Sequence, residues 1–298
     1  MDMTNCYNES REPMNITFND RTLDLSSPKI MGILNLTPNS FSDGGDYYDP
    51  ERALDRAYEI LEEGADILDI GAESTNPKAT PISSQEEVRR LRPVVSLLRQ
   101  KLDIPLSIDT FRAETMKQML DLGVDIINDV TALSDPKALD SLLESKAAVI
   151  LMHMLGDHQK MHITGNYRLT GGVTHSVFQH LEKIAQKCVS EGIDSSRIIL
   201  DPGFGFDKSI PEQLTLLKEL RRLTHKSQYP YLVGVSRKRF IGAITHVEAP
   251  KERLAGNLAV ALWSIEQGAK ILRVHDVKAT KEAFLMWQAI NHAESSSL

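Results

Sequence analysis

Short apolar runs alternate along this chain with longer segments in which apolar residues recur at helical spacing. The first run, Ile30–Leu36, is nearly continuous and is typical of a strand buried on both faces. It ends at residues that favour loops, including Asn35, Thr37 and Pro38. A segment with helical periodicity, Pro50–Gly64, follows and closes on a glycine. The same sequence of events then repeats along the chain.

The repeated pattern predicts an α/β fold with eight strands, each followed by a helix. The further strands are expected at Ile67–Ile70, Leu106–Ile108, Ile126–Ile127, Ala147–Met152, Ile198–Leu200, Tyr231–Val235 and Lys270–Val274. The further helices are expected at Gln85–Lys101, Ala113–Leu122, Pro136–Ser145, His175–Glu191, Pro211–Thr224, Arg253–Gln267 and Lys278 to about Asn291. Eight such units predict a single (β/α)8 TIM barrel. The rival, a doubly wound open sheet, would normally show a glycine fingerprint where this chain reads NLTPNS.

The start of the chain predicts a small addition to the barrel. Residues 1–28 form an extension and a short β-hairpin, because Asn15–Leu25 alternates around Asn19 and Asp20. We expect this hairpin to close one end of the barrel, which would occupy residues 29–298.

Composition and charge narrow the class of protein. The 298 residues are 41% hydrophobic and 25% charged, as in soluble globular proteins. A net charge of −7 argues against a nucleic-acid partner, and no apolar run approaches the ~20 residues of a membrane span. Cys6 and Cys188 fit no metal spacing. We therefore expect a cytoplasmic protein with reduced thiols that acts on small molecules.

Polar side chains follow all eight predicted strands. They are Asn35, Glu73 with Thr75, Asp109, Asn128, His153, Asp201, Ser236 with Lys238, and Arg273 with His275. In a barrel of this kind the site lies at the carboxyl ends of the strands. Polar residues can simply mark where strands meet solvent, but that explanation is weak when all eight exits carry them. We expect these side chains to converge on one mouth.

The side chains also divide by the ligand that they suit. Lys238, Arg273 and His275, with Asn35 and Thr75, suit an anion such as a phosphate or diphosphate. Asp109, Asn128 and Asp201, expected on the other side of the mouth, suit a flat heterocycle with amino and ring N–H donors. Phe204 and Phe206, on the glycine-containing loop DPGFGF, offer faces for a second aromatic ring.

Several long motifs, in order, resemble the dihydropteroate synthases from about Ile30 to the last helix. They are MGILNLTPNSFSDGG, GADILDIGAESTNP, SIDT, INDV, LMHM, ILDPGFGFDKS, VGVSRKRFIG and RVHDV. The resemblance implies a barrel that joins 6-hydroxymethyl-7,8-dihydropterin diphosphate to p-aminobenzoate, giving 7,8-dihydropteroate and diphosphate in folate biosynthesis. It also implies a requirement for Mg²⁺, competition by sulfonamides, and a homodimer formed through the seventh and eighth barrel helices.

The resemblance further implies roles for individual residues. The residues that resemble the pterin-binding groups are Asp109, Asn128 and Asp201, with Lys238 lying against the ring. Asn35 resembles the Mg²⁺ ligand, and Arg273 and His275 resemble the residues that bind the diphosphate. The residues that resemble the p-aminobenzoate contacts are Thr75, Phe206 and Ser236, and Asn76 and Met152 are also expected to bind substrate. Asp109, Lys238, Arg273 and His275 are the expected catalytic residues.

The second strand-end loop departs from the family pattern. The family reads STRPG where this chain reads Ser74-Thr75-Asn76-Pro77-Lys78, so an arginine expected near the anion is missing. Lys78 could bring a point charge into the same space. The alternative function is that of a pterin-binding barrel of the corrinoid methyltransferase kind, which shares the aspartate and asparagine groups but does not need the NLTPNSFSDGG loop. A catalytically inactive scaffold would be expected to lack the polar strand ends, which are present.

Overall fold

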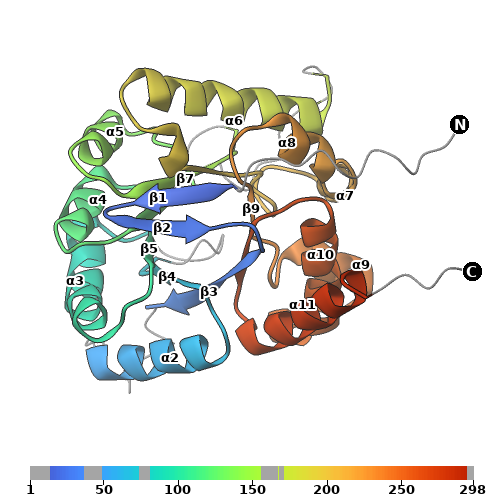
Figure 1. Cartoon of the computed structure of the whole chain (residues 1–298), viewed down its shortest axis with the longest axis horizontal. Helices are drawn as coiled ribbons and strands as arrows, with labels where there is room; N and C mark the ends of the chain where they lie inside the picture. The colour runs from blue at the N-terminus through green and yellow to red at the C-terminus, as the bar shows by residue number, and fades with distance from the viewer. Residues whose placement is uncertain (1–13, 37–48, 74–80, 156–166, 168–170, 294–298) are drawn as a thin grey trace, which may run out of the picture.

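Eight parallel strands form a barrel surrounded by helices (Figure 1) in the computed structural model, which describes residues 14–36, 49–73, 81–155, 167 and 171–293. The strands are β3 (Lys29–Asn35), β4 (Ile67–Gly71), β5 (Leu106–Asp109), β6 (Ile126–Asp129), β7 (Ala148–Met152), β8 (Ile198–Asp201), β9 (Leu232–Val233) and β10 (Ile271–Val274). They pair in the order β8-β7-β6-β5-β4-β3-β10-β9. A parallel bridge between Leu200 and Tyr231 joins β8 to the start of β9 and closes the barrel. The predicted fold is confirmed.

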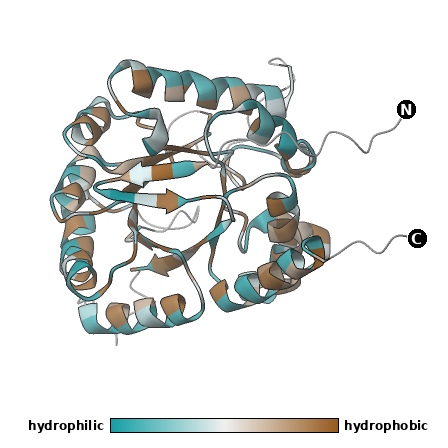
Figure 2. Cartoon of the chain, in the orientation of Figure 1, coloured by the Kyte–Doolittle hydropathy of each residue, from teal (hydrophilic) through white to brown (hydrophobic). Residues whose placement is uncertain are grey.

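The helices cover the outside of the barrel with their apolar faces turned inward (Figure 2). They are α2 (Pro50–Glu62), α3 (Ser84–Lys101), α4 (Ala113–Leu120), α5 (Pro136–Leu143), α6 (Val173–Ser190), α7 (Ile210–Lys218), α8 (Leu220–Lys226), α9 (Arg239–Thr245), α10 (Leu254–Glu266) and α11 (Val277–Asn291), with 3₁₀ turns η3 (Ser195–Arg197) and η4 (Pro250–Glu252). Helix α2 illustrates the pattern: Asp49 caps it, Pro50 begins it, and Ala53, Ala57 and Ile60 are buried. Among the described residues, none of the helices combines the length and apolar character needed to cross a membrane.

Two predicted elements differ in the structure. The helix expected at Pro211–Thr224 is divided at Glu219, which ends α7 and begins α8. The spacing of apolar residues does not indicate this break, because buried leucines continue on both sides of it, from Leu216 to Leu223. The strand expected at Tyr231–Val235 is shortened to β9, since the chain turns beyond it and Arg237 adopts a left-handed conformation with φ 60°. Helix α9 was not predicted.

The N-terminal hairpin closes the end of the barrel where the strands begin. It consists of β1 (Asn15–Phe18) and β2 (Arg21–Asp24), drawn in blue across the barrel in Figure 1. Its apolar side chains Ile16 and Phe18 are buried in a cluster that includes Met31, Ile67, Ile126, Ile150, Ile199 and Ile271 of the barrel strands. At the turn, the Asn19 side chain donates to the Asp125 carboxylate at 2.9 Å. The carboxyl ends of the strands lie at the opposite end of the barrel.

Candidate active site

Arg273 on β10 organises the carboxyl ends of the neighbouring strands. Its Nε donates to Asp69 Oδ2 on β4 at 2.6 Å, and its Nη2 donates to Asp109 Oδ2 on β5 at 2.7 Å. Asn128 Nδ2 on β6 also approaches Asp69 Oδ2, at 3.4 Å. Asp69 is fully buried. One charged network therefore joins four strands across the barrel mouth.

Burial shifts the titration of this network. It raises the pKa of Asp109 to about 7, with the neighbouring Asp69 and Glu87 adding to the rise and Arg273 opposing it. Burial disfavours the Arg273 cation, but the Asp69 and Asp109 carboxylates outweigh it and raise the pKa of Arg273. Asp109 thus becomes ionised close to neutral pH, while Arg273 stays charged throughout.

A second group of side chains surrounds Lys238 at the start of α9. Lys238 Nζ lies 4.3 Å from the centre of the Phe206 ring, within the range of a cation–π contact. Burial, followed by the Arg273 charge, lowers the pKa of Lys238 to about 8. Phe206 packs with Met152 and Val130 in a small apolar cluster separate from the main core. The mouth therefore offers an apolar wall beside a cation.

Asp201 at the end of β8 is buried, and its Oδ1 accepts a 2.8 Å hydrogen bond from the Gly203 amide. Burial raises its pKa, opposed by that amide and by Lys238 and Arg273. A Cβ built on Gly234 of the β9 loop would lie 3.9 Å from Asp201 Oδ2 and from the Arg273 side chain. The missing side chain at Gly234 leaves room beside Asp201, where a flat ligand could hydrogen-bond its outer oxygen.

Ser236 and His275 meet at the ends of β9 and β10. The Ser236 hydroxyl accepts from the His275 amide at 3.2 Å and lies 3.0 Å from His275 Nδ1. Burial, then the Arg237 and Arg273 charges, lowers the pKa of His275 to about 3. The ring is therefore neutral at physiological pH. His275 therefore contributes a polar imidazole rather than a positive charge.

The residues near Asn35 fit a magnesium ion that arrives with a phosphate ligand. A Cβ built on Gly71 would lie 3.8 Å from Asn35 Oδ1 and 3.9 Å from Asp109 Oδ2. Asp109 Oδ2 already accepts from Arg273 at 2.7 Å, so Asn35 Oδ1 is the oxygen of this pair that could ligate a metal. Among the residues that the structure describes, no group of three or more His, Cys, Asp or Glu side chains could hold a metal. Mg²⁺ commonly keeps several waters and binds through one or two protein oxygens plus substrate phosphates. The donor set fits that arrangement and does not form an all-protein cage.

The residues predicted for the anion and those predicted for the heterocycle are in contact with each other in the structure, while the ligand that each group binds stays a prediction. Arg273, placed with the anion group, pairs directly with Asp109, placed with the heterocycle group. The long arginine side chain spans the barrel, because both side chains point into a shared interior that strand order alone does not resolve. Arg273 thus connects the two sets through Asp109 and Asp69.

Three residues expected at the mouth are held by other parts of the structure. His153 is fully buried, with its ring 4.9 Å from that of His180 on α6. Glu73 pairs with Arg112 at 2.6 Å. Phe204 is buried in the main core, so of the two phenylalanines only Phe206 can face a ligand. Such residues follow strands as expected, but these side chains contact α6, the residue that precedes α4, and the main core respectively.

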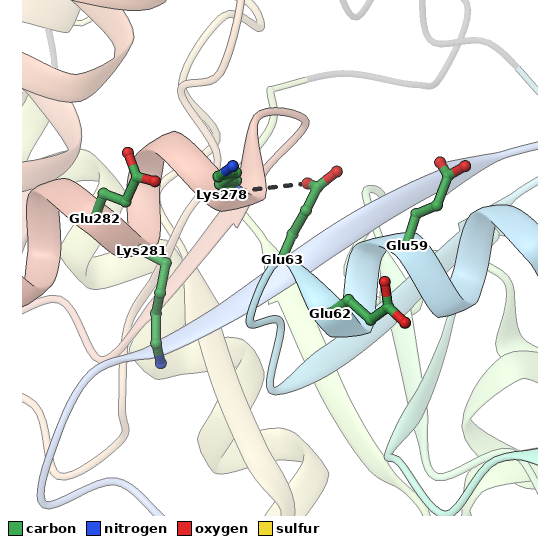
Figure 3. Close-up of a pocket in the computed structure, with 6 residues that line it drawn as sticks. All are labelled: Glu59, Glu62, Glu63, Lys278, Lys281 and Glu282. Atoms are coloured by element: carbon green, nitrogen blue, oxygen red, sulfur yellow. Dashed lines mark hydrogen bonds between the residues drawn. The ribbon is translucent and has the colours of Figure 1, made fainter.

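Sequence reasoning missed Asp69 as a site residue, although it stands out as the single polar residue within an apolar strand. Thr75, Asn76 and Lys78 lie outside the described residues. A separate hollow on the outer surface lies between α2 and α11 (Figure 3) and is lined by Glu59, Glu62, Glu63, Lys278, Lys281 and Glu282. It shares no residue with the mouth.

Comparisons with known proteins agree with this geometry. The family described as "Pterin binding enzyme" matches residues 31–275. The dihydropteroate synthase of Haemophilus influenzae is 42% identical over 94% of this chain and 100% of its own length, and that of Escherichia coli is 41% identical over 92% and 96%.

Solved structures give the same result. Dihydropteroate synthase from Xanthomonas albilineans with 4-aminobenzoic acid has a TM-score of 0.87 and 42% identity, covering 95% of this chain and 100% of that one. The same enzyme in complex with 7,8-dihydropteroate has a TM-score of 0.84 at 40% identity, covering 94% and 100%. The Yersinia pestis enzyme with a sulfonamide drug has a TM-score of 0.86 at 40% identity, again covering 94% and 100%. The chain therefore belongs to the pterin binding enzyme family, among the dihydropteroate synthases.

Proposed function

We propose that this protein condenses 6-hydroxymethyl-7,8-dihydropterin diphosphate with p-aminobenzoate to give 7,8-dihydropteroate and diphosphate. The observation that carries the proposal is the network of Arg273, Asp69, Asp109 and Asn128 at the barrel mouth, in a chain that belongs to this family. Buried carboxylates held by a single guanidinium suit a ligand that presents several N–H donors and carries an anionic tail.

The pterin would occupy the space beside Asp201. Asp201 Oδ2 would accept hydrogen bonds from N–H groups at the edge of the ring. The Asn128 side-chain amide would donate to the ring and accept from it along the same edge. Lys238, already above the Phe206 ring, would lie against a pterin face. Asp201 and Asn128 are buried, which would strengthen each hydrogen bond to the ring by excluding water.

Charge then determines the reaction. The bond between the pterin methylene and the diphosphate oxygen breaks, and the oxygen keeps the electron pair. Arg273 would stabilise the charge gathering on the diphosphate, and the neutral imidazole of His275 would offer it a ring N–H hydrogen bond without any proton transfer. Asp109, ionised near neutral pH, would stabilise the positive charge left on the methylene and its conjugated ring.

The second substrate completes the reaction. The amine nitrogen of p-aminobenzoate attacks the methylene, a C–N bond forms, and the nitrogen releases its extra proton to solvent. The amine is neutral at pH 7, so no strong base is required, and holding the two substrates in line supplies most of the acceleration. Phe206 and Ser236 would contact p-aminobenzoate, together with Thr75.

Asn35 would be the protein ligand of a magnesium ion bound with the diphosphate. The ion would supply positive charge against the phosphate oxygens when bound. Asn35 Oδ1 would supply the oxygen that ligates it, because Asp109 Oδ2 is held by Arg273.

A second copy of the chain would cover the exposed apolar side chains of α9, α10 and α11. These are Ile244, Trp263, Leu285, Met286 and Ile290, between 46% and 64% exposed. Large apolar side chains gathered on adjacent helices are typical of an interface. The interface of such a homodimer would lie on the outer helices, away from the barrel mouth.

The direct test is formation of 7,8-dihydropteroate from the two substrates by the purified protein, with Mg²⁺ present and absent. Asp201→Asn should lower kcat/KM roughly 30-fold or more, since it removes a charge-assisted hydrogen bond of about 2 kcal/mol. Asp20→Asn on the exposed hairpin turn is the matched control and should retain full activity. A folded protein that forms no dihydropteroate, or that instead binds methyltetrahydrofolate as a methyl donor, would overturn the proposal.

A further inference from the structure

Lys208 is a buried ammonium that the reaction described above does not use. Its side chain is completely inaccessible, and Nζ lies 2.9 Å from Asp207 Oδ1 and 3.0 Å from the Gly203 carbonyl oxygen. The carbonyl of His153, at the end of β7, lies 3.4 Å from Nζ. An ammonium has three N–H donors, so these three oxygens satisfy it completely. A buried cation with such partners indicates a built interaction rather than a chance one.

Asp207 extends the interaction to the loop after β7. Its second oxygen accepts from the Tyr167 hydroxyl at 2.6 Å and from the Leu155 amide at 2.8 Å. The Asp207 side chain is also fully buried. The Lys208–Asp207 pair therefore joins the strand-end loops of β7 and β8 beneath the mouth.

The loop between β8 and α7 needs such an anchor because of its conformation. Gly203 and Gly205 have φ values of 70° and 84°, in the left-handed region that favours glycine. A Cβ on Gly203 would collide with the His153 carbonyl oxygen, and one on Gly205 would lie 2.6 Å from Lys238 Cδ. The loop is thus pressed between the end of β7 on one side and the Lys238 side chain on the other.

Gln213 of α7 provides a second, uncharged anchor for the same loop. Its Oε1 accepts from the Gly205 amide at 2.9 Å, and its Nε2 donates to the Lys208 carbonyl oxygen at 2.9 Å. The loop that these anchors fix carries Asp201 at its start and Phe206 near its end. It therefore sets where two expected ligand contacts stand relative to Lys238.

We propose that Lys208 is a positioning residue, whose buried ammonium holds residues 201–208 in the conformation that presents Asp201 and Phe206 to the pterin. The identification of the ligand as a pterin rests on the proposed function. The ammonium also adds positive charge near Asp201, together with Lys238 at the start of α9 and Arg273 on β10. Removing that charge should make the Asp201 carboxylate easier to protonate.

Calorimetric binding of 6-hydroxymethyl-7,8-dihydropterin diphosphate between pH 5 and 9 tests the proposal. Lys208→Met should weaken binding about tenfold or more and move the acid limb of the binding profile to higher pH by about one unit. Gln213→Leu breaks the uncharged anchor of the same loop and should weaken binding without moving the acid limb. Asp207→Asn combined with Lys208→Met removes both charges and serves if the single variant does not fold.

The outcomes separate this proposal from the proposed function. A wild-type protein that does not bind the pterin diphosphate refutes the function. Wild-type binding with an unchanged affinity and acid limb in a folded Lys208 variant refutes the positioning role alone. An equal movement of the acid limb in Gln213→Leu, or loss of folding in both lysine variants, would reduce Lys208 to a general element of stability and overturn the proposal.

Discussion

Replacement of Asp109 by Asn should change how the stability of the protein depends on pH. In the folded protein burial raises the pKa of Asp109 from 3.8 to about 7. Between these two values the folded chain holds a proton that the unfolded chain has released. The retained proton therefore stabilises the folded state. This contribution to the free energy of unfolding is fully present below pH 3.8 and is lost as the pH rises through 7.

The size of the effect follows from the shift. A shift of this extent corresponds to about 4 kcal/mol at most, since each pKa unit represents about 1.36 kcal/mol. Over a practical window from pH 5 to pH 8, the wild-type free energy of unfolding should fall by roughly 3 kcal/mol more than that of Asp109→Asn. Other buried acids, including Asp129 with a pKa raised to about 6, titrate in both proteins and cancel in the difference.

Urea unfolding at intervals across this pH window measures the difference directly. Asp20→Asn is the control, because it makes the same substitution at a hairpin turn whose side chain is 94% exposed. Its curve should follow the wild-type curve within a few tenths of a kcal/mol at every pH. Parallel curves for the wild type and Asp109→Asn would refute the reasoning, since burial would then not control the Asp109 carboxylate.

Further substitutions test other contacts. Asp69→Asn should lower the free energy of unfolding by about 2–3 kcal/mol in urea, because the partly buried Arg273 guanidinium loses a fully buried charged acceptor; an unchanged value would contradict the network. Gly203→Ala should cost more than about 2 kcal/mol, while Gly123→Ala, with φ 81° and nothing within 4 Å of its Cβ, should cost about 1; equal costs would exclude the collision with His153. Met286→Glu should convert a dimer to a monomer in sedimentation with unchanged circular dichroism, and a persistent dimer would place the interface elsewhere.

The fold was accessible from the sequence because a parallel barrel imposes a regular pattern. Strands buried on both faces read as short apolar runs such as β7, and each must be followed by a crossover. The boundaries of the helices and strands were harder to predict from the sequence. The break at Glu219 leaves no trace in the apolar spacing, and the short helix α9 begins within the cluster Arg237-Lys238-Arg239, where site chemistry and a helix start overlap.

The site was accessible only where position along the chain determines position in space. Strand ends meet at one mouth in any such barrel, which is why Asp109, Asn128 and Arg273 could be grouped in advance. The direction in which each side chain points could not be predicted from the sequence. His153 follows its strand as Asp201 does, yet its ring packs against that of His180 on α6. Lys208 was not singled out from the sequence, and its burial depends on oxygens of Gly203 and Asp207 in its own loop and on the distant carbonyl of His153.

The structure of the protein bound to 7,8-dihydropteroate tests the assignment of the barrel mouth most directly. We expect the pterin ring beside Asp201 and Asn128, with hydrogen bonds of 2.7–3.2 Å from its nitrogens and Lys238 against its face. The aminobenzoate ring should lie near Phe206 and Ser236. Density for the ligand away from the mouth, for example at the hollow between α2 and α11, would contradict the site.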